Sequence, residues 1–376
     1  MQEMKKRRIV LASLLKPVDD TRMYEKLGVT LASEYEVYII GQPPKKSTAP
    51  ANVTFISIPA HGRLAIQRLT TPWRVLRRVV GIRPDVLIVC TAELLPIALC
   101  ARLLTGTKII YDVQENYAQN ILYGEVWPRL MRPWLAKMVR LTEWSTSWLV
   151  CHFLLAEQSY ADELGFIRKD FTIVENKAVL PSQRPHTEDE KTDHINDIRL
   201  LFSGTLAVTT GVFKAIELAR QLHDADASIR LHIVGYAAQQ DVRISLYKLA
   251  SENTFIELTG IDHIVPHAEI IEAIGRAHFG IIAYPENKST WSSYPTKLYE
   301  YLASNLPILL IDNPRWISLC APYSAAVSFP SHAVITDAAP LLARMRMQSF
   351  YASKPENVLW DSEAPRLHAA ISAIVK

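Results

Sequence analysis

Short apolar runs of strand length alternate with helical patterns along most of the chain. The runs are continuous Val, Ile and Leu segments, which are typical of strands buried on both faces of a parallel sheet. Helices are expected between several of them, including Met23–Ser33 and Glu93–Leu104. In the first half the pattern predicts strands at Ile9–Leu15, Tyr35–Ile40, Val53–Ile58, Asp85–Cys90, Lys108–Tyr111, Trp148–Leu155 and Phe171–Val174.

The alternation stops between Pro181 and Asp197, where the chain is polar, charged and without periodicity, and then restarts. We therefore predict two successive α/β domains, residues 1–180 and 198–355, joined by a linker at 181–197. The tail 356–376 ends in a helical pattern and is expected to pack back on the first domain. Predicted strands are Arg199–Phe202, Ile229–Val234, Phe255–Leu258, Gly280–Ala283, Ile308–Ile311 and Ala325–Ser328; predicted helices are Val212–Leu222, Asp241–Ser251, Ala268–Ala277, Pro295–Ser304, Ile335–Met347 and Ala364–Val375.

Composition narrows the class of protein. The 376 residues are 49% hydrophobic and 21% charged, which excludes a disordered chain, a collagen and a disulfide scaffold. A net charge of only +3 argues against a nucleic-acid-binding polycation. Residues 1–180 carry 24 Lys and Arg against 17 Asp and Glu, and the rest carries 17 against 21. The two halves are therefore expected to meet different partners, none of them a nucleic acid.

Cysteine usage and hydropathy indicate a cytoplasmic protein. The four cysteines sit in apolar surroundings without the spacing of metal ligands, as expected of reduced core cysteines. No run reaches the roughly 18 apolar residues of a membrane span. Residues 5–15 resemble a short signal peptide, but Lys16-Pro17 and Asp19-Asp20 follow at once, so a first strand is the favoured interpretation.

Two loops in the second half have phosphate-binding character. Gly204 and Thr205 follow a predicted strand, and glycine there lets the backbone approach a ligand. Pro295 suits the first turn of a helix, where Thr296 and Lys297 would face an anion. Glu300 lies on the same side and would accept hydrogen bonds from ribose hydroxyls. The alternative is a surface ion pair between Lys297 and Glu300.

Several segments in this order resemble a large, mostly retaining family of GT-B glycosyltransferases. These family-4-like enzymes use nucleotide sugars, often in bacterial surface polysaccharide synthesis. The most specific segment is Pro295–Tyr301 (PTKLYEY). The others are Tyr111–Glu115 (YDVQE), Leu155–Tyr160 (LAEQSY), Val174–Lys177 (VENK), Ser203–Thr205 (SGT) and His232–Gly235 (HIVG).

The resemblance implies two Rossmann-like, doubly wound α/β domains facing a central cleft. The first would hold the acceptor and the second a nucleotide diphosphate-sugar donor, with no metal and no other cofactor. Donor binding would fall to Gly204, Thr205, Pro295, Thr296, Lys297 and Glu300. The implied activity is that of a hexosyltransferase in cell-surface glycan synthesis, with a glycan or a polyprenyl-diphosphate-linked saccharide as acceptor.

The sequence also departs from the family pattern. Ser292 stands where a first glutamate is frequent, eight positions before Glu300, and Gln114 where histidine is common. Residues 208–210 read Val-Thr-Thr where Arg and Lys are usual, so Lys297 would carry the neutralisation of the diphosphate. These departures leave open a catalytically silent GT-B protein that binds nucleotide or glycan beside an active partner.

Candidate acceptor and catalytic residues follow two strands of the first half. Lys16 and Arg22 would hold an anionic acceptor, and Asp19 or Asp20 would orient a hydroxyl. The alternative is a helix-capping loop with Asp20 or Thr21 as the cap. Lys297 would stabilise the leaving diphosphate, and if the reaction inverts configuration, Asp112 or Glu115 would be the general base. Their alternative is a loop of solvated carboxylates.

Two basic, Trp-containing stretches suggest a membrane surface. Six arginines lie between Arg63 and Arg83 without an acid, and the stretch Trp127 to Trp148 interleaves basic and apolar residues. Such helices suit the surface of anionic lipid, here the inner face of the plasma membrane. The alternative is that the apolar stripes pack on the sheet while the arginines face water. The arginines of the first stretch are Arg63, Arg68, Arg74, Arg77, Arg78 and Arg83.

Overall fold

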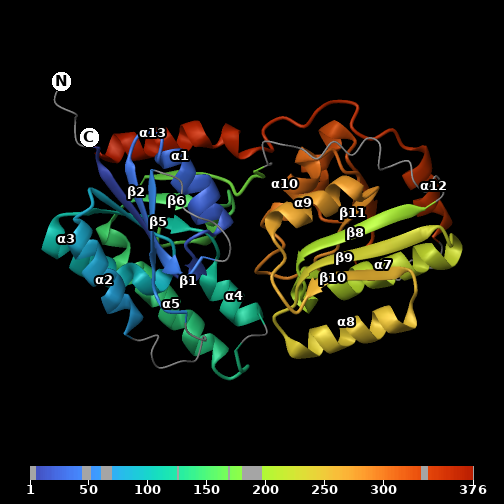
Figure 1. The fold of residues 1–376 in the computed structure, drawn as a ribbon, viewed down its shortest axis with the longest axis horizontal. Helices are drawn as coiled ribbons and strands as arrows, with labels where there is room; N and C mark the ends of the chain where they lie inside the picture. The colour runs from blue at the N-terminus through green and yellow to red at the C-terminus, as the bar shows by residue number, and fades with distance from the viewer. Residues whose placement is uncertain are drawn as a thin grey trace. The chain divides into compact units, whose positions relative to one another are not determined.

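The structure, a computed structural model, describes residues 6–44, 52–60, 70–124, 127–167, 170–179, 197–331 and 338–375. The chain forms two units (Figure 1). Unit 1 comprises Met1–Asn176 with Trp360–Lys376, and unit 2 comprises Lys177–Leu359. The predicted linker lies outside the described residues except for Asp197, as do Arg63 and Arg68.

Unit 1 is built on a parallel sheet of seven strands in the order β3-β2-β1-β4-β5-β6-β7. This is the order of a doubly wound sheet, in which the chain first winds outward from β1 and then crosses over to β4. The strands are β1 (Arg8–Pro17), β2 (Glu36–Gln42), β3 (Val53–Ser57), β4 (Val86–Val89), β5 (Lys108–Val113), β6 (Val150–Leu155) and β7 (Phe171–Ile173).

Helices cover both faces of this sheet. Figure 1 shows α2, α3 and α5 together on one face, and α1 and the C-terminal α13 on the other. The return of α13 places the end of the chain in unit 1. The helical segments are η1 (Thr21–Gly28), α1 (Val29–Leu31), α2 (Thr71–Ile82), η3 (Ala92–Leu94), α3 (Leu95–Thr105), α4 (Tyr117–Tyr123), α5 (Arg132–Thr146), η4 (Ser147–Leu149), α6 (Tyr160–Glu163), η8 (Trp360–Ser362) and α13 (Ala364–Val375).

Unit 2 repeats the arrangement with six parallel strands in the order β10-β9-β8-β11-β12-β13. Figure 1 shows α7 and α8 on one face of this sheet and α9 and α10 on the other. The strands are β8 (Ile198–Thr205), β9 (Ile229–Tyr236), β10 (Ile256–Ile261), β11 (Phe279–Ile282), β12 (Ile308–Ile311) and β13 (Ala326–Phe329).

The helical segments of unit 2 connect these strands and place α10 directly before β12. Residues Lys297–Ala303 of α10 are all buried, so this helix is a core element. The segments are η6 (Val208–Thr210), α7 (Val212–Ala225), α8 (Gln240–Glu252), α9 (His267–Arg276), α10 (Thr296–Ala303), α11 (Pro314–Cys320), η7 (Ala321–Tyr323) and α12 (Ala339–Met347).

Each predicted strand is present, and the predicted fold class, α/β with two doubly wound sheets, is confirmed. Continuous apolar runs specify these strands well because both faces of each sheet are covered. The helix predicted at Met23–Ser33 takes a different form in the structure. It begins at Thr21 as the π-helical segment η1 and continues into the short helix α1. No helix in the described ranges is long and apolar enough to cross a membrane.

Candidate functional site

The carboxyl end of β8 in unit 2 is shaped by glycine. Gly204 has φ of 95°, a conformation that L-residues rarely adopt, and a Cβ there would lie 3.9 Å from Cε of Lys297. Gly235 is its register partner on β9, and a Cβ on Gly235 would lie 1.8 Å from the carbonyl oxygen of Gly204. Larger residues would therefore break the pairing at this edge, while Thr205, which follows, is exposed.

The start of α10 lies beside this edge. Pro295 is the N-cap in an extended conformation, and its side chain makes no capping hydrogen bond. The first N–H groups of a helix have no intrahelical partner, and together with the helix dipole they favour an anion. Gly204 and Lys297 are thus brought together as the sequence predicted, with Pro295 and Thr296 half-buried at the helix start.

The preceding loop is anchored from α11. The Nδ2 atom of Asn313 donates to the carbonyl oxygen of Trp291 over 2.8 Å, and Nε1 of Trp316 donates to that of Ser293 over 2.9 Å. Trp316 is fully buried. These contacts fix the path of the chain into Pro295, so the start of α10 is held in place from a neighbouring helix.

Lys297 is the unusual residue of this edge. Its side chain is buried, and Nζ has no hydrogen-bond partner in the part of the chain that the structure describes. Nζ lies 4.0 Å from the ring centroid of Phe202 and 5.2 Å from that of Tyr284. Burial lowers the pKa of Lys297 to about 7, although Glu300 acts in the opposite direction. Ring faces stabilise the ammonium, yet its hydrogen-bonding capacity is unused.

Glu300 is one turn further along α10 and is also buried. Its Oε1 lies 3.2 Å from Nε2 of His267, the first residue of α9. The interpretation of Lys297 and Glu300 as a surface ion pair is wrong, because both are buried and Nζ of Lys297 has no such partner. Sequence reasoning missed His267, since it lies 33 residues from Glu300 and only the fold brings them together.

The corresponding edge of unit 1 contains a buried ion pair. Arg22 and Asp112 are 3% and 0% exposed, and Nη2 of Arg22 lies 2.7 Å from Oδ1 of Asp112. Nε of Arg22 donates to both carboxylate oxygens, and Nη1 donates to the carbonyl oxygen of Val174 over 3.0 Å. Gln114 donates to Oδ2 of Asp112 over 2.7 Å. The carboxylate is therefore saturated from within unit 1.

This pairing changes the roles expected for two residues. Arg22 was predicted to meet an anionic acceptor and Asp112 to act as a base or to lie in solvent. Asp112 is not solvated, and each of the two side chains neutralises the other. The physical reason is that the turn after β1 and the end of β5 meet at one sheet edge, which the sequence separation of 90 residues conceals.

The remaining predicted residues of unit 1 lie around this pair. Nζ of Lys16 is 3.7 Å from Oδ2 of Asp20. Burial disfavours the charged form of Lys16 and by itself would lower its pKa. The attraction of the charged form to Asp20 and Glu115 is stronger, so the pKa of Lys16 is raised. Oδ1 of Asp20 accepts from the backbone N–H groups of Arg22 and Met23, so Asp20 caps η1. Glu115, half-buried, accepts from Asn120 over 2.9 Å, and Asp19 is half-buried beside Asp20.

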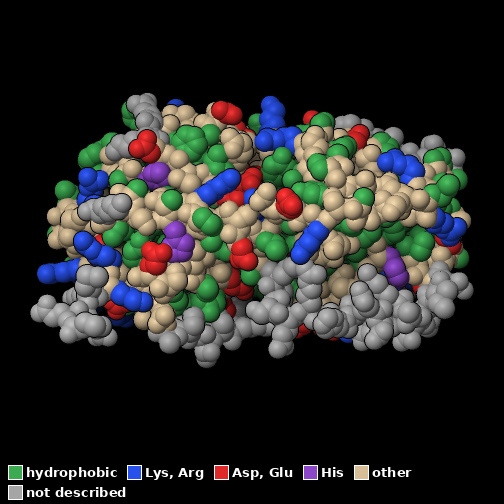
Figure 2. Space-filling model, turned by 90° about the horizontal axis from the view of Figure 1, so that it is seen from above, with side chains coloured by type: hydrophobic (Ala, Val, Ile, Leu, Met, Phe, Trp, Pro, Cys, Tyr) green, Lys and Arg blue, Asp and Glu red, His purple; other side chains and the backbone are tan. Residues whose placement is uncertain are grey.

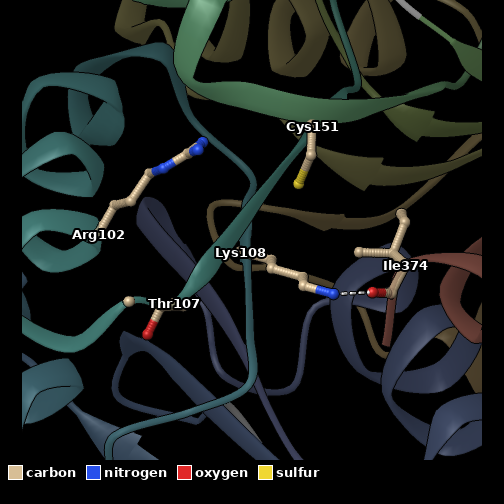
Figure 3. A pocket seen from close by; sticks show the side chains of 6 residues that line it. Arg102, Thr107, Lys108, Cys151 and Ile374 are labelled. Carbon is tan, nitrogen blue, oxygen red and sulfur yellow. Dashed lines mark hydrogen bonds between the residues drawn. The ribbon is translucent and has the colours of Figure 1, made fainter. Parts of the chain in front are cut away.

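A surface pocket of about 450 Å³ lies elsewhere in unit 1 (Figure 3). Lys108 starts β5 and Cys151 lies near the start of β6, so the pocket is at the amino edge of the sheet, opposite Asp112. Nζ of Lys108 donates to the carbonyl oxygen of Ile374 in α13. None of the predicted site residues lines it. Within the described ranges, no group of His, Cys, Asp or Glu side chains has the arrangement of a metal site.

Comparison with solved structures gives close agreement in fold at low sequence identity. Sucrose-phosphate synthase from Thermosynechococcus elongatus superposes with a TM-score of 0.69 at 12% identity, covering 98% of this chain and 96% of that one. An α,α-trehalose-phosphate synthase (UDP-forming) from Burkholderia xenovorans, in complex with glucose-6-phosphate, gives 0.68 at 11% identity over 98% and 99%. HepE from Anabaena, in complex with UDP and glucose, gives 0.65 at 10% over 97% and 98%.

No protein-family model matches the chain, and no curated protein matches its sequence significantly. The structural matches extend over nearly the whole of both chains, so they cover both units. They show that the chain has the GT-B fold, as the sequence predicted.

Proposed function

We propose that the chain is a glycosyltransferase whose unit 2 binds a nucleotide diphosphate-sugar. The observation that carries the proposal is the buried Nζ of Lys297, which lacks a hydrogen-bond partner among the described residues and lies beside Gly204 and the start of α10. A buried cation without a partner is costly unless something satisfies it. A diphosphate supplies both the charge and the acceptor oxygens, and the α10 N–H groups supply further donors.

The same geometry suits the chemistry of sugar transfer. The bond between the anomeric carbon and the diphosphate oxygen breaks, and its electron pair leaves with the diphosphate. Lys297 and the first N–H groups of α10 would face this developing charge and would stabilise the transition state without a metal or another cofactor. Glu300, oriented by His267, would accept hydrogen bonds from the ribose, and Gly204 with Thr205 would border the phosphates.

The fate of the acceptor proton depends on the stereochemistry. As the acceptor hydroxyl oxygen bonds to the anomeric carbon, its proton passes to the leaving phosphate oxygen if the configuration is retained. If it is inverted, Glu115 is the base favoured by its partial exposure, because Asp112 is saturated by Arg22. Lys16, Asp19 and Asp20 would hold the acceptor, and the Arg22–Asp112 pair would position their loop.

The similar solved structures support the donor class. One is a UDP-forming synthase, one is in complex with UDP and glucose, and one, from E. coli, is bound with UDP-2-fluoro glucose. For this chain we infer a hexosyl donor and a saccharide acceptor, free or linked to a polyprenyl diphosphate. The setting we propose is cell-surface glycan synthesis on the cytoplasmic side of the plasma membrane.

A second candidate is a catalytically silent GT-B protein that binds nucleotide or glycan beside an active partner. It is favoured by Ser292, which stands at the position where a glutamate would touch the donor sugar. It is also favoured by Gln114, whose amide nitrogen donates to Asp112. A silent protein that binds nucleotide shares the nucleotide site with the first candidate and differs from it only in turnover, whereas a silent protein that binds glycan lacks that site.

Calorimetric titration with UDP, GDP and ADP, followed by their glucose conjugates, tests the shared nucleotide site. We expect one nucleotide to bind and to raise the melting temperature, and the matching sugar conjugate to lose its sugar to acceptor or, slowly, to water. Binding without release of the diphosphate over long incubation with candidate acceptors favours the silent protein. No binding of UDP, GDP or ADP would contradict the glycosyltransferase and the nucleotide-binding silent protein, and would leave a protein that binds glycan alone.

A further inference from the structure

An unusual apolar stripe faces outward on α5 and the turn before it. Leu130, Trp134, Met138 and Leu141 recur at spacings of three and four residues, so they share one helix face. Their exposed fractions are 90%, 72%, 63% and 59%. Trp144 and Trp148 continue the stripe and are also mostly exposed. The alternative in which this stripe packs on the sheet is therefore wrong for α5.

The inward side of α5 is fixed by smaller and polar residues. Ala136, Glu143 and Thr146 are its buried positions. Oε1 of Glu143 accepts from the hydroxyl of Tyr111 on β5 over 3.0 Å, and Oε2 accepts from Nη1 of Arg140 over the same distance. A buried hydrogen-bonded carboxylate holds the rotation of the helix, because turning it would leave that group unpaired. The outward stripe is thus a fixed feature of unit 1.

Neighbouring helices extend this apolar layer. α3 packs against both α2 and α5, on the same face of the sheet (Figure 1). Trp73 on α2 is 61% exposed, and Leu103 and Leu104 at the end of α3 are 77% and 67% exposed. On α2 the other apolar residues, such as Val75 and Val79, pack inward and the arginines face water, as the alternative interpretation had it.

The charge around the layer is predominantly basic, although Glu93 on η3, which packs against α5, is an exposed acid. Residues 70–84 contain four arginines and no acid, and residues 127–149 contain three arginines, one lysine and Glu143. Burial raises the pKa of Glu143 to about 7, so at neutral pH it offsets less than one of these charges. By contrast, the face of the molecule that carries α13 shows charged side chains of both signs dispersed among polar and apolar ones (Figure 2). The basic residues are Arg74, Arg77, Arg78, Arg83, Arg129, Arg132, Lys137 and Arg140.

We propose that the outer side of α2, α3 and α5 is a docking surface for an anionic phospholipid bilayer. Exposed Trp, Leu and Met side chains can insert at the boundary of the acyl chains, while the neighbouring Arg and Lys side chains contact the anionic headgroups. A second copy of this chain is disfavoured as the occupant, because a symmetric dimer would bring two predominantly basic surfaces together, with few exposed acids among the described residues to pair them.

The surface adjoins the edge of unit 1 that holds the proposed acceptor residues. The chain leaves β5 at its carboxyl end, passes through α4 and α5, and enters the parallel strand β6 at its amino end. α5 therefore begins at the carboxyl edge, where Asp112 and Glu115 lie. If the proposed function is right, docking brings a lipid-linked acceptor to this edge; the docking itself does not depend on it.

Flotation of the full chain with phosphatidylglycerol vesicles tests the proposal, with phosphatidylcholine vesicles as the neutral comparison. We expect binding to the anionic vesicles that weakens as salt is raised, and a blue shift of Trp fluorescence. Replacing Arg74, Arg77 and Arg78 by Gln together should weaken binding on the order of 100-fold, since each basic residue contributes about fivefold. The triple change Trp134→Ser, Met138→Ser and Leu141→Ser should weaken it at least about tenfold.

The matched control removes three exposed apolar side chains from elsewhere, by Val29→Ser, Ile244→Ser and Met347→Ser. It should bind vesicles like the parent chain. Nucleotide titration of all three variants should match the parent, which separates loss of docking from loss of the donor site. Absence of binding to anionic vesicles at low salt, equal loss in the control, or a dimer that the α5 variant converts to a monomer would overturn the proposal.

Discussion

The two units place opposite kinds of charge chemistry at equivalent edges of their sheets. In unit 1, Arg22 and Asp112 are buried and joined by several hydrogen bonds, with Gln114 completing the carboxylate. In unit 2, Lys297 is also buried, but among the described residues its ammonium contacts ring faces and has no hydrogen-bond acceptor. The buried charges of the first edge pair with each other, although Oε1 of Gln114 has no hydrogen-bond partner among the described residues, whereas the ammonium of the second edge has unused donors.

The contrast bears on the roles proposed for the two units. A satisfied buried pair contributes rigidity and leaves little charge for a ligand. An ammonium kept without a counter-ion raises the free energy of the empty protein, and an anionic ligand recovers that cost. Disrupting each edge should therefore have opposite effects on stability.

The largest effect is expected from Arg22→Met in unit 1. It leaves the Asp112 carboxylate buried without its cation, which costs about 3–5 kcal/mol of unfolding free energy. Urea denaturation at pH 7 measures the loss. Adding Asp112→Leu in the same chain should recover most of it, because the unpaired charge is removed. If Arg22→Met alone lowers the free energy of unfolding by less than about 1 kcal/mol, the pairing is contradicted.

Lys297→Met should do the reverse in unit 2. Without the unpaired ammonium the empty protein should become more stable, by about 1 kcal/mol, while the affinity for UDP falls at least about 30-fold with the lost charge-assisted contacts. Thermal denaturation and calorimetry measure the two changes. Lys248→Met, an exposed change on α8, is the control and should alter neither. A destabilised Lys297→Met with unchanged UDP affinity would remove the diphosphate assignment.

The affinity for UDP should depend on pH in a defined window. The pKa of Lys297 is lowered to about 7 by burial, so above that pH most of the free protein must take up a proton to bind. Affinity should then fall by about tenfold per pH unit above 7. In the absence of ligand, Lys297 is protonated in the unfolded chain and mostly neutral in the folded protein between pH values of about 7 and 10.5. The unfolded state binds more protons in this window, so the contribution of Lys297 to stability rises with pH there. Calorimetry from pH 6 to 9 measures the affinity, and a flat profile contradicts this.

The smallest effect concerns the ribose. Glu300→Gln should weaken UDP binding about fivefold to tenfold, because one charged hydrogen-bond acceptor becomes neutral. Inorganic pyrophosphate, which lacks the ribose, should bind both proteins with similar affinity. His267→Ala should give a smaller loss of the same kind, since His267 orients Glu300. Equal losses for UDP and pyrophosphate would place Glu300 at the phosphates instead.

The fold followed from the sequence because its signal is local. The continuous apolar runs at Ile308–Ile311 and Val86–Val89 are typical of strands whose sheet is covered by helices on both faces. Both runs are strands in the structure, β12 and β4. The turn at Gly204 and the helix start at Pro295 carry local backbone signals, so the backbone at this edge of unit 2 could also be predicted.

The pairings at both edges could not be predicted in the same way. Arg22 with Asp112 and His267 with Glu300 join distant segments, and no periodicity reports which side chains meet at a sheet edge. The sequence also left undetermined which face of α5 is exposed. Its apolar stripe resembles that of a core helix, and only the folded structure, with the stripe exposed and Glu143 buried, shows which side faces outward.

The central claim is that the unpaired ammonium of Lys297 receives the diphosphate. Proton uptake on UDP binding, obtained by calorimetry at pH 8 in buffers of different ionisation enthalpy, tests it most directly. With a pKa of about 7 in the empty protein, close to one proton, about 0.9, should be taken up per UDP bound by the parent chain. Lys297→Met should take up none. Binding by the parent chain without proton uptake would contradict the account.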